Sequence, residues 1–262
     1  MSAAGETQYF TSRTEDTAVL WKQLQRRVAG AGLDLSGLDR INRCLRIRFG
    51  VEEPHYTDPL QRPEFYIPGL HAQPWHDPSR FDWVESLERA HGAVAQEYLE
   101  LQRSGLIEKR PEGRGGRWAT CHLFFMGEKS RELCERCPET SKLVEAIPGA
   151  TSAGLVYFAS LAPGARLEPH CGPTNARLRC HLGLRVPPGC SIRVGSETRS
   201  WREGKCVVFD DSFEHEVWHT GAEARSVLVF DIWHPDLTHE ETIAIASLMR
   251  LAALQPGAQG MH

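Results

Sequence analysis

The sequence of 262 residues lacks three features that would direct it to a membrane or to nucleic acid. It contains no uninterrupted apolar run of ~18 residues, so we expect no transmembrane span. The first residues, MSAAGETQYFTSRTED, are polar and contain no apolar stretch of the kind found in signal peptides. The chain has 30 Lys and Arg against 34 Asp and Glu and no basic run, so we expect no nucleic-acid partner.

A second pair of closely spaced cysteines is also missing. Cys134 and Cys137 form one Cys-x-x-Cys motif among eight cysteines, and a structural zinc site needs further ligands at a matching spacing. We therefore interpret the pair first as free thiols, next as a local disulfide and last as a zinc site. Eight cysteines in a chain of this length are more typical of a reducing compartment than of a disulfide scaffold, which predicts a cytoplasmic protein.

Helical periodicity dominates the first part of the chain. The composition, 41% hydrophobic and 24% charged, is that of a soluble globular protein. Apolar residues at helical spacing predict helices at 14–30 and 37–48, and a longer one over 80–103 after a proline-rich connector. These patterns predict an N-terminal helical segment, residues 1–58, followed by a main domain, residues 59–262.

Strand periodicity begins after Gly116. Seven short segments rich in β-branched and aromatic residues follow one another, separated by turns that contain Gly and Pro. One helix at about 138–147 interrupts them, and a C-terminal helix at about 238–254 follows. Short strands at this spacing predict a mainly β fold with flanking helices, either a sandwich, a jelly roll or a barrel, with its core at about 117–234.

Two histidines and one arginine are notable for their places near strand ends. His170 follows a turn and precedes Gly172, while His215 lies between two predicted strands, in FDDSFEHEVWH. On neighbouring strands of a double-stranded β-helix, two such positions converge at one mouth of the barrel. Two imidazoles with open water positions suit Fe(II). Arg225 enters the next strand, and its planar fork matches a carboxylate.

The order of these residues is that of 2-oxoglutarate oxygenases, with one exception. Most such enzymes carry Asp or Glu two residues after the first histidine, where this sequence has Gly172. Through PHCGPTNARLRCHLGL, WREGKCVVFDDSFEHEVWH and RSVLVFDIWHPDLT, the chain resembles the aspartyl/asparaginyl β-hydroxylase family, which has glycine at that position. The resemblance is close over about 150–238 and looser over most of the chain after residue 60. It implies a double-stranded β-helix of the jelly-roll, cupin-like kind.

The resemblance also implies a role for each residue of the site. His170 and His215 would be the iron ligands. Arg225 would bind the distal carboxylate of 2-oxoglutarate. Arg179 and His181 would hold this co-substrate near its metal-chelating end.

Two more groups complete the implied site. Arg177 shares a strand face with Arg179 and His181, and its counterpart in the protein hydroxylases reaches the substrate carboxylate. Asp211 would hold a metal-bound water, with Asp210 the less favoured alternative. Both aspartates could instead form a turn and a helix cap. The basic strand face could equally be the exposed side of an edge strand, because any half-buried strand alternates in this way.

The sequence departs from the family pattern at two positions. Ala159 stands where the family has a serine that helps to hold the distal carboxylate, and Thr120 stands where the protein hydroxylases have a substrate-contacting glutamine. The departure at Ala159 concerns the co-substrate site, and the departure at Thr120 leaves the identity of the substrate open. We interpret Trp201, like the other tryptophans near the β segments, as a core residue.

The function implied by the resemblance is that of an Fe(II)- and 2-oxoglutarate-dependent dioxygenase that uses O2 to hydroxylate a C–H bond. The expected target is the β-carbon of an aspartyl or asparaginyl unit in a protein, peptide or small molecule, with a lipid chain as a further option. The alternative is a catalytically inactive β-barrel module that binds 2-oxoglutarate or a metal.

Overall fold

The structure is a computed structural model in which residues 26, 29–30, 32, 34–109 and 118–253 are described. The chain divides into two compact units, one comprising Met1–Pro54 with Thr238–His262 and the other His55–Leu237. The C-terminal helix, which the sequence pattern attached to the main domain, thus falls in the same unit as the N-terminal segment. None of the described helices is both long and apolar enough to cross a membrane.

The first unit contains helices α2 (Asp39–Arg48) and α7 (His239–Ala253), both close to their predicted places. Arg40 of α2 donates from Nε and Nη2 to the two carboxylate oxygens of Glu241 of α7, at 2.9 and 2.6 Å. This two-point ion pair connects two helices that lie far apart in the sequence. The helix predicted at 14–30 lies mostly outside the described residues.

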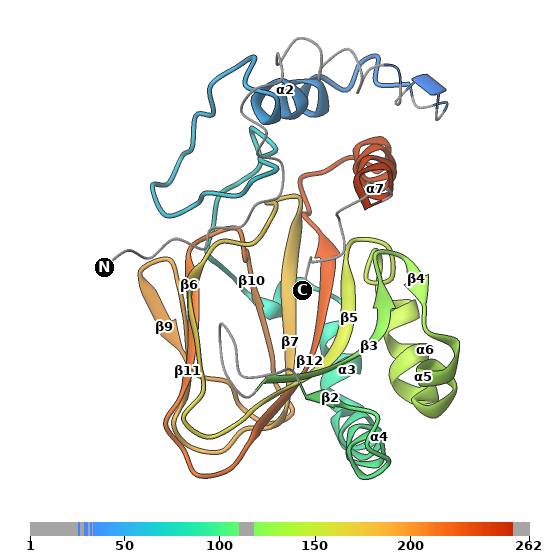
Figure 1. Ribbon diagram of the computed structural model, residues 1–262, viewed down its shortest axis with the longest axis vertical. Helices are drawn as coiled ribbons and strands as arrows, with labels where there is room; N and C mark the ends of the chain where they lie inside the picture. Colours follow the sequence, from blue (N-terminus) through green and yellow to red (C-terminus); the bar gives the residue numbers. More distant parts are fainter. Residues whose placement is uncertain (1–25, 27–28, 31, 33, 110–117, 254–262) are drawn as a thin grey trace. The chain divides into compact units, whose positions relative to one another are not determined.

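The second unit contains two antiparallel β-sheets that face each other (Figure 1). The strands are β1 (Trp75–His76), β2 (Glu108–Lys109), β3 (Trp118–Phe125), β4 (Glu128–Lys129), β5 (Leu155–Leu161), β6 (Arg166–His170), β7 (Arg177–Arg185), β8 (Cys190–Val194), β9 (Glu197–Arg199), β10 (Cys206–Phe209), β11 (His215–His219) and β12 (Arg225–Trp233). The large sheet has the order β1-β10-β7-β12-β5-β3-β2, with β4 paired to β3, and the small sheet has the order β6-β11-β8-β9.

From β5 onward the chain alternates between the two sheets, except that the consecutive strands β8 and β9 both lie in the small sheet. Strands β5, β7, β10 and β12 lie in the large sheet, whereas β6, β8, β9 and β11 lie in the small one. This alternation is the topology of a double-stranded β-helix, so the predicted jelly-roll fold is confirmed. Of the strands from β5 onward, the sequence pattern missed β6 and β9, because their residues are mostly exposed and have no apolar alternation.

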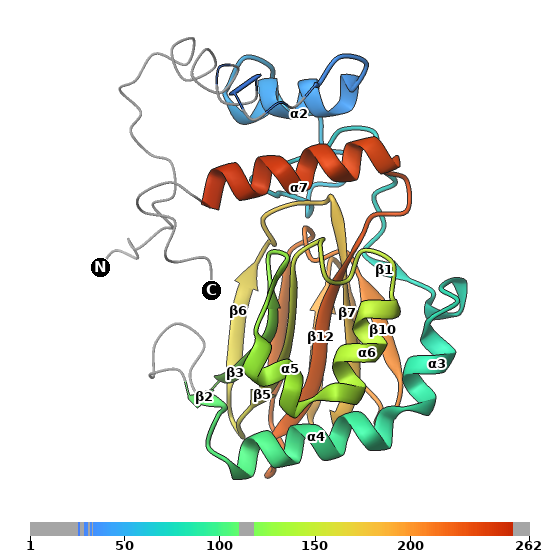
Figure 2. The ribbon, with the colours of Figure 1, turned by 90° about the vertical axis from the view of Figure 1, so that its right-hand side faces the viewer.

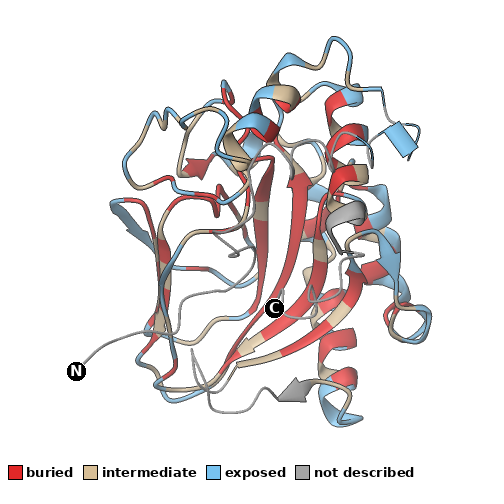
Figure 3. Cartoon of the chain, turned by 45° about the horizontal axis from the view of Figure 1, so that its top comes forward, coloured by how far each residue is buried: buried red, intermediate tan, exposed pale blue. Residues whose placement is uncertain are grey.

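Strand β7 shows how alternation separates two environments. Arg177, Arg179 and His181 point into the space between the sheets, whereas Leu178 and Cys180 are fully buried on the opposite face. Figure 3 shows the central strands of the large sheet as almost continuously buried. Because β7 lies between β10 and β12, its basic face is not the exposed side of an edge strand.

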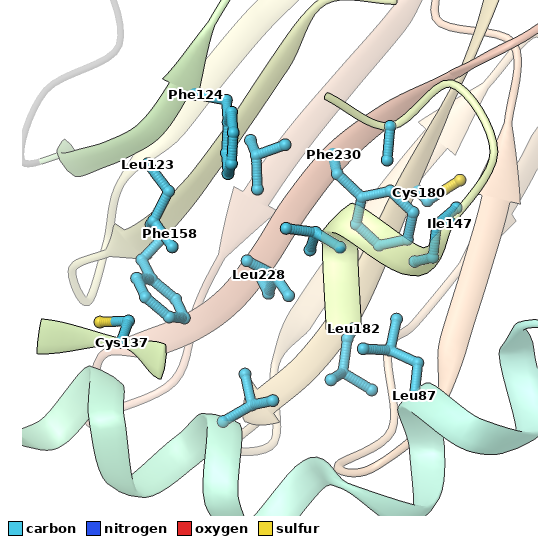
Figure 4. Close-up of a cluster of buried hydrophobic side chains, with 14 of the residues drawn as sticks. Leu87, Leu123, Phe124, Cys137, Ile147, Phe158, Cys180, Leu182, Leu228 and Phe230 are labelled. Atoms are coloured by element: carbon cyan, nitrogen blue, oxygen red, sulfur yellow. The ribbon is translucent and has the colours of Figure 1, made fainter. Parts of the chain in front are cut away.

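Helices cover the outer face of the large sheet (Figure 2). They are η1 (Pro78–Arg80), α3 (Val84–Arg89), α4 (His91–Arg103), α5 (Arg131–Arg136) and α6 (Pro138–Ala146). The single helix predicted over 80–103 is wrong, because the helical pattern breaks at Ala90 between α3 and α4. Figure 4 shows Leu87 and Ile147 beside Leu182 and Phe230 of the sheet, so the outer face is an apolar layer.

The cysteine pair belongs to this apolar layer. Cys134 and Cys137 are buried free thiols, and the other six cysteines are free as well. Burial raises the pKa of Cys137 to about 12, so its thiol stays protonated at neutral pH. The pair therefore packs as small apolar side chains, the first of the three interpretations given above.

Glu97 is a buried carboxylate that joins α4 to α6. It accepts hydrogen bonds from the backbone N–H groups of Glu139 and Thr140, at 2.8 and 2.9 Å, and from the Thr140 hydroxyl at 2.5 Å. These donors lie in the first turn of α6, where N–H groups have no partner within the helix. The carboxylate thus satisfies them and lies at the helix end that favours negative charge.

We predict that Glu97→Ala lowers the free energy of unfolding by about 1.5–3 kcal/mol, the usual loss for hydrogen bonds to a charged group. Glu100→Ala, on the exposed side of the same helix, is the control and should change it by less than about 0.5 kcal/mol. Urea unfolding followed by circular dichroism measures both. Equal losses in the two variants would contradict the role of Glu97 as a cap.

Candidate active site

His170 and His215 lie side by side between the sheets. His170 ends β6, His215 begins β11, and the two are direct cross-strand partners. Their ring centroids are 4.2 Å apart. The fold therefore brings together two histidines that are 45 residues apart in the sequence, as the motif predicted.

Each of these histidines is fixed by a bond to its own strand. Nδ1 of His170 lies 2.8 Å from the carbonyl oxygen of Glu168, and Nδ1 of His215 lies 2.9 Å from that of Phe213. Because a carbonyl oxygen can only accept, each Nδ1 must be the protonated nitrogen. In a neutral imidazole each Nε2 then keeps its lone pair, which is the usual state of metal-ligating histidines.

The environment of His215 keeps its imidazole neutral. Burial, followed by the neighbouring His170 ring, lowers the pKa of His215 to about 4. His170 is exposed, so one side of the pair is open. No group of three or more His, Cys, Asp or Glu side chains among the described residues is arranged to hold a metal. A metal here would thus have two imidazole ligands and several positions for other ligands, which suits Fe(II).

Gly172 lies against the carboxylate of Asp211. A Cβ atom on Gly172 would lie 2.5 Å from Cγ of Asp211 and 2.6 Å from each of its carboxylate oxygens. The N–H of Gly172 also donates to the backbone oxygen of Asp211, at 2.6 Å. Asp211 therefore fills the space that a side chain at position 172 would need, and it supplies a negative charge next to the histidine pair from another segment.

Asp210 and Asp211 have different surroundings. Asp210 accepts hydrogen bonds from Gln61 and from the backbone N–H of Ser212, at 3.0 and 2.9 Å. Burial, the main cause, raises its pKa to about 7. Neither oxygen of Asp211 accepts a hydrogen bond from the described residues, and its Oδ2 lies 2.9 Å from Nη1 of Arg179 as an ion pair. Asp210 thus stabilises the turn through its hydrogen bonds, and Asp211 faces the candidate active site.

The basic face of β7 meets a second aspartate, Asp231 of β12. Nε and Nη2 of Arg179 donate to its two oxygens at 2.9 and 3.3 Å, and Nη1 of Arg177 lies 3.5 Å from Oδ2. Although burial opposes ionisation, the two arginines hold the pKa of Asp231 below its ordinary value. With Asp211, these residues form a group of two cations and two anions.

His181 lies farther along the same face. It is buried, and its Nδ1 accepts a hydrogen bond from the indole N–H of Trp201 at 3.1 Å. Burial, then the charges of Arg225 and Arg179, keep the pKa of His181 well below its ordinary value. A neutral imidazole therefore lies between the balanced charge group and Arg225.

Arg225 is a buried cation without a carboxylate. It forms no ion pair within the described part of the chain, and its Nε has no hydrogen-bond partner there. Its guanidinium lies over the ring of Trp201, 4.3 Å from the centroid. Burial lowers the pKa of Arg225 to about 10, so it is still charged at neutral pH. An unpaired buried cation of this kind fits an anionic ligand.

The two departures from the family pattern are neighbours in the structure. Thr120 of β3 and Ala159 of β5 are cross-strand partners, and both are buried. Tyr157 lies on the same face of β5, with its ring stacked on His122 at 4.8 Å. The wall beside the charge group therefore carries a phenol and small side chains.

The sequence pattern missed two residues of this site, Asp231 and Trp201. Asp231 shares a face with Arg225, Val227 and Val229 in the regular alternation of β12, and that period of two could have indicated it. Trp201 lies between β9 and β10, outside any periodic segment. Its interpretation as a core residue was incomplete, because it is buried and also contacts two residues of the site.

A sequence model of the family described as aspartyl/asparaginyl beta-hydroxylase matches residues 88–235, which is more than half of the chain. The chain belongs to this family. The match includes both histidines, the basic face of β7, Asp211 and Arg225.

Individual relatives agree with the assignment. Human aspartyl/asparaginyl beta-hydroxylase is 36% identical over 209 residues, which are 76% of this chain and 28% of that protein. Human aspartate beta-hydroxylase domain-containing proteins 2 and 1 are 34% and 38% identical over 228 and 229 residues, each covering 80% of this chain. The chain spans 60% and 57% of those two relatives, so it matches only part of each.

Solved structures include similar folds at low identity. A prolyl hydroxylase from Trichoplax adhaerens, in complex with a hypoxia inducible factor peptide fragment, is 13% identical with a TM-score of 0.42, covering 60% of this chain and 82% of that one. A Pseudomonas putida prolyl-4-hydroxylase is 18% identical with a TM-score of 0.39, covering 57% and 87%. Membership of the family follows from the sequence matches.

We predict that Gly172→Ala destabilises the metal-free protein by about 1–3 kcal/mol, because its Cβ overlaps the Asp211 carboxylate. In an Asp211→Ala background the same change should lower the free energy of unfolding by less than about 0.5 kcal/mol. Denaturant unfolding of the four proteins in this double-mutant cycle measures the coupling. The same loss in both backgrounds would contradict the contact.

Proposed function

We propose that this protein is an Fe(II)- and 2-oxoglutarate-dependent dioxygenase that hydroxylates the β-carbon of an aspartyl or asparaginyl unit in a protein, peptide or small molecule. The observation that carries the proposal is the combination of a histidine pair with free Nε2 lone pairs and a buried arginine without a carboxylate. Family membership and the names of the relatives support the reaction and the substrate class. The cytoplasmic location stays a prediction.

The two kinds of ligand would bind to different walls of the barrel. His170 and His215, on the small sheet, would hold the metal. Arg225, on the large sheet, would bind the distal carboxylate of 2-oxoglutarate, with His181 and Arg179 toward its other end. When bound together, Fe(II), 2-oxoglutarate and O2 supply the oxidising power that replaces a C–H bond by C–OH.

The protein's own residues would set charge and orientation. Asp211 brings one negative charge to the histidine pair. Its Oδ2 is paired with Arg179, and its Oδ1 has no hydrogen-bond partner among the described residues, which would leave Oδ1 to accept a hydrogen bond from a water. Asp231 holds Arg179 in place from the other side through two hydrogen bonds. Arg177 is buried beside Asp231, and its Nε has no partner among the described residues, which leaves an N–H for a substrate group.

A turnover experiment tests the proposal. The protein is incubated with Fe(II), ascorbate, 2-oxoglutarate and peptides that contain Asp or Asn, and succinate and the peptide mass are followed. We expect succinate together with the gain of one oxygen atom, and neither product with His215→Ala. Binding of 2-oxoglutarate without succinate in all mixtures would favour the inactive binding module instead.

We predict that Arg225→Lys raises the dissociation constant of 2-oxoglutarate about ten- to a hundredfold, because losing charge-assisted hydrogen bonds costs about 1.5–3 kcal/mol. Arg225→Met should abolish binding and raise the melting temperature of the ligand-free protein, because it removes an unpaired buried charge. Thermal unfolding with and without 2-oxoglutarate measures both effects. A Met variant that keeps the shift caused by 2-oxoglutarate would refute the role of Arg225.

A further inference from the structure

Trp201 contacts two residues of the proposed co-substrate site at once. Its indole N–H donates to Nδ1 of His181 at 3.1 Å, and the Arg225 guanidinium lies 4.3 Å from the centroid of its ring. The side chain is 3% exposed, so both contacts are shielded from solvent. One buried tryptophan therefore links the two ends of the proposed 2-oxoglutarate position.

The Trp201–His181 contact is a hydrogen bond between nearly parallel rings. The ring planes differ by 12° and the centroids are 5.9 Å apart. An indole N–H can only donate, so Nδ1 of His181 must be an acceptor. In a neutral imidazole the proton then lies on Nε2.

This state of His181 is the opposite of that of His170 and His215. In the neutral form of those two residues Nδ1 carries the proton and Nε2 keeps its lone pair. In His181 the proton on Nε2 can be donated to a carboxylate, and it prevents that nitrogen from binding a metal. The hydrogen-bond partners of Nδ1 thus divide three neighbouring histidines into two metal ligands and one donor.

We infer that Trp201 is a positioning residue, which fixes His181 as a hydrogen-bond donor to 2-oxoglutarate and supports Arg225 through its ring face. The inference rests on the proposed function, because it assigns 2-oxoglutarate to this site. It adds a residue outside the periodic strands that acts on both ends of the co-substrate.

Two variants separate the two contacts of Trp201. Trp201→Phe removes the N–H donor and keeps an aromatic ring below Arg225. Trp201→Leu removes both. Trp75→Phe is the matched control, because Trp75 is buried in the same apolar cluster between the sheets and its Nε1 has no hydrogen-bond partner among the described residues.

The first measurement needs no ligand. Long-range 1H–15N spectra of the imidazoles, with His181 assigned by its loss in His181→Asn, report which ring nitrogen carries the proton. We expect Nε2–H in the parent and in Trp75→Phe, and a mixture of the two tautomers in Trp201→Phe. A parent spectrum with Nδ1–H, or an unchanged His181 in Trp201→Phe, would overturn the inference.

The second measurement is a titration of the zinc-loaded protein with 2-oxoglutarate. Trp201→Phe should raise the dissociation constant about three- to tenfold, the loss expected for one neutral hydrogen bond. Trp201→Leu should raise it at least about threefold more, because the cation–π contact is also lost. Equal affinities in Trp201→Phe and Trp75→Phe would overturn the inference. If the parent itself binds no 2-oxoglutarate, the proposed function fails, whereas the tautomer result still stands.

Discussion

A buried positive charge without a counter-charge is the constraint on which the rest of the site depends. Arg225 lies between the sheets and forms no ion pair within the described residues. Desolvating a guanidinium is costly, and the face of Trp201 offsets only part of that cost. The apolar layer under the helices stabilises the large sheet from its other face, so the fold tolerates the charge. The carboxylate of a bound ligand would supply the missing counter-charge of Arg225.

Charge balance distinguishes the two regions of the barrel interior. Near the histidine pair, Arg177 and Arg179 are matched by Asp211 and Asp231, so this region carries little net charge. Near Arg225 no carboxylate of the described residues balances the positive charge. A doubly anionic co-substrate would therefore be drawn with one carboxylate to Arg225, while its other end lies among groups whose charges are already compensated. The three histidines differ in the same way between the two regions. Nδ1 faces a carbonyl oxygen in His170 and His215, whereas Nδ1 of His181 accepts a hydrogen bond from Trp201.

Much of this arrangement is visible in the sequence because strands have a period of two. The alternation in β7 and β12 separates an inner face, which carries the charged residues of the site, from an apolar outer face. The two histidines occupy strand ends that the topology makes neighbours. Other features depend on contacts between distant segments. The contact of Asp211 with Gly172 and the position of Trp201 have no local signal. The break at Ala90 was missed because apolar spacing continues across it.

The most direct test of the central claim is a crystal structure with 2-oxoglutarate and Zn²⁺ in place of Fe(II). We expect the metal at about 2.0–2.1 Å from Nε2 of both His170 and His215. We expect the distal carboxylate of 2-oxoglutarate to accept hydrogen bonds from the guanidinium of Arg225. A metal bound away from the histidine pair, or a 2-oxoglutarate molecule that does not contact Arg225, would contradict the account.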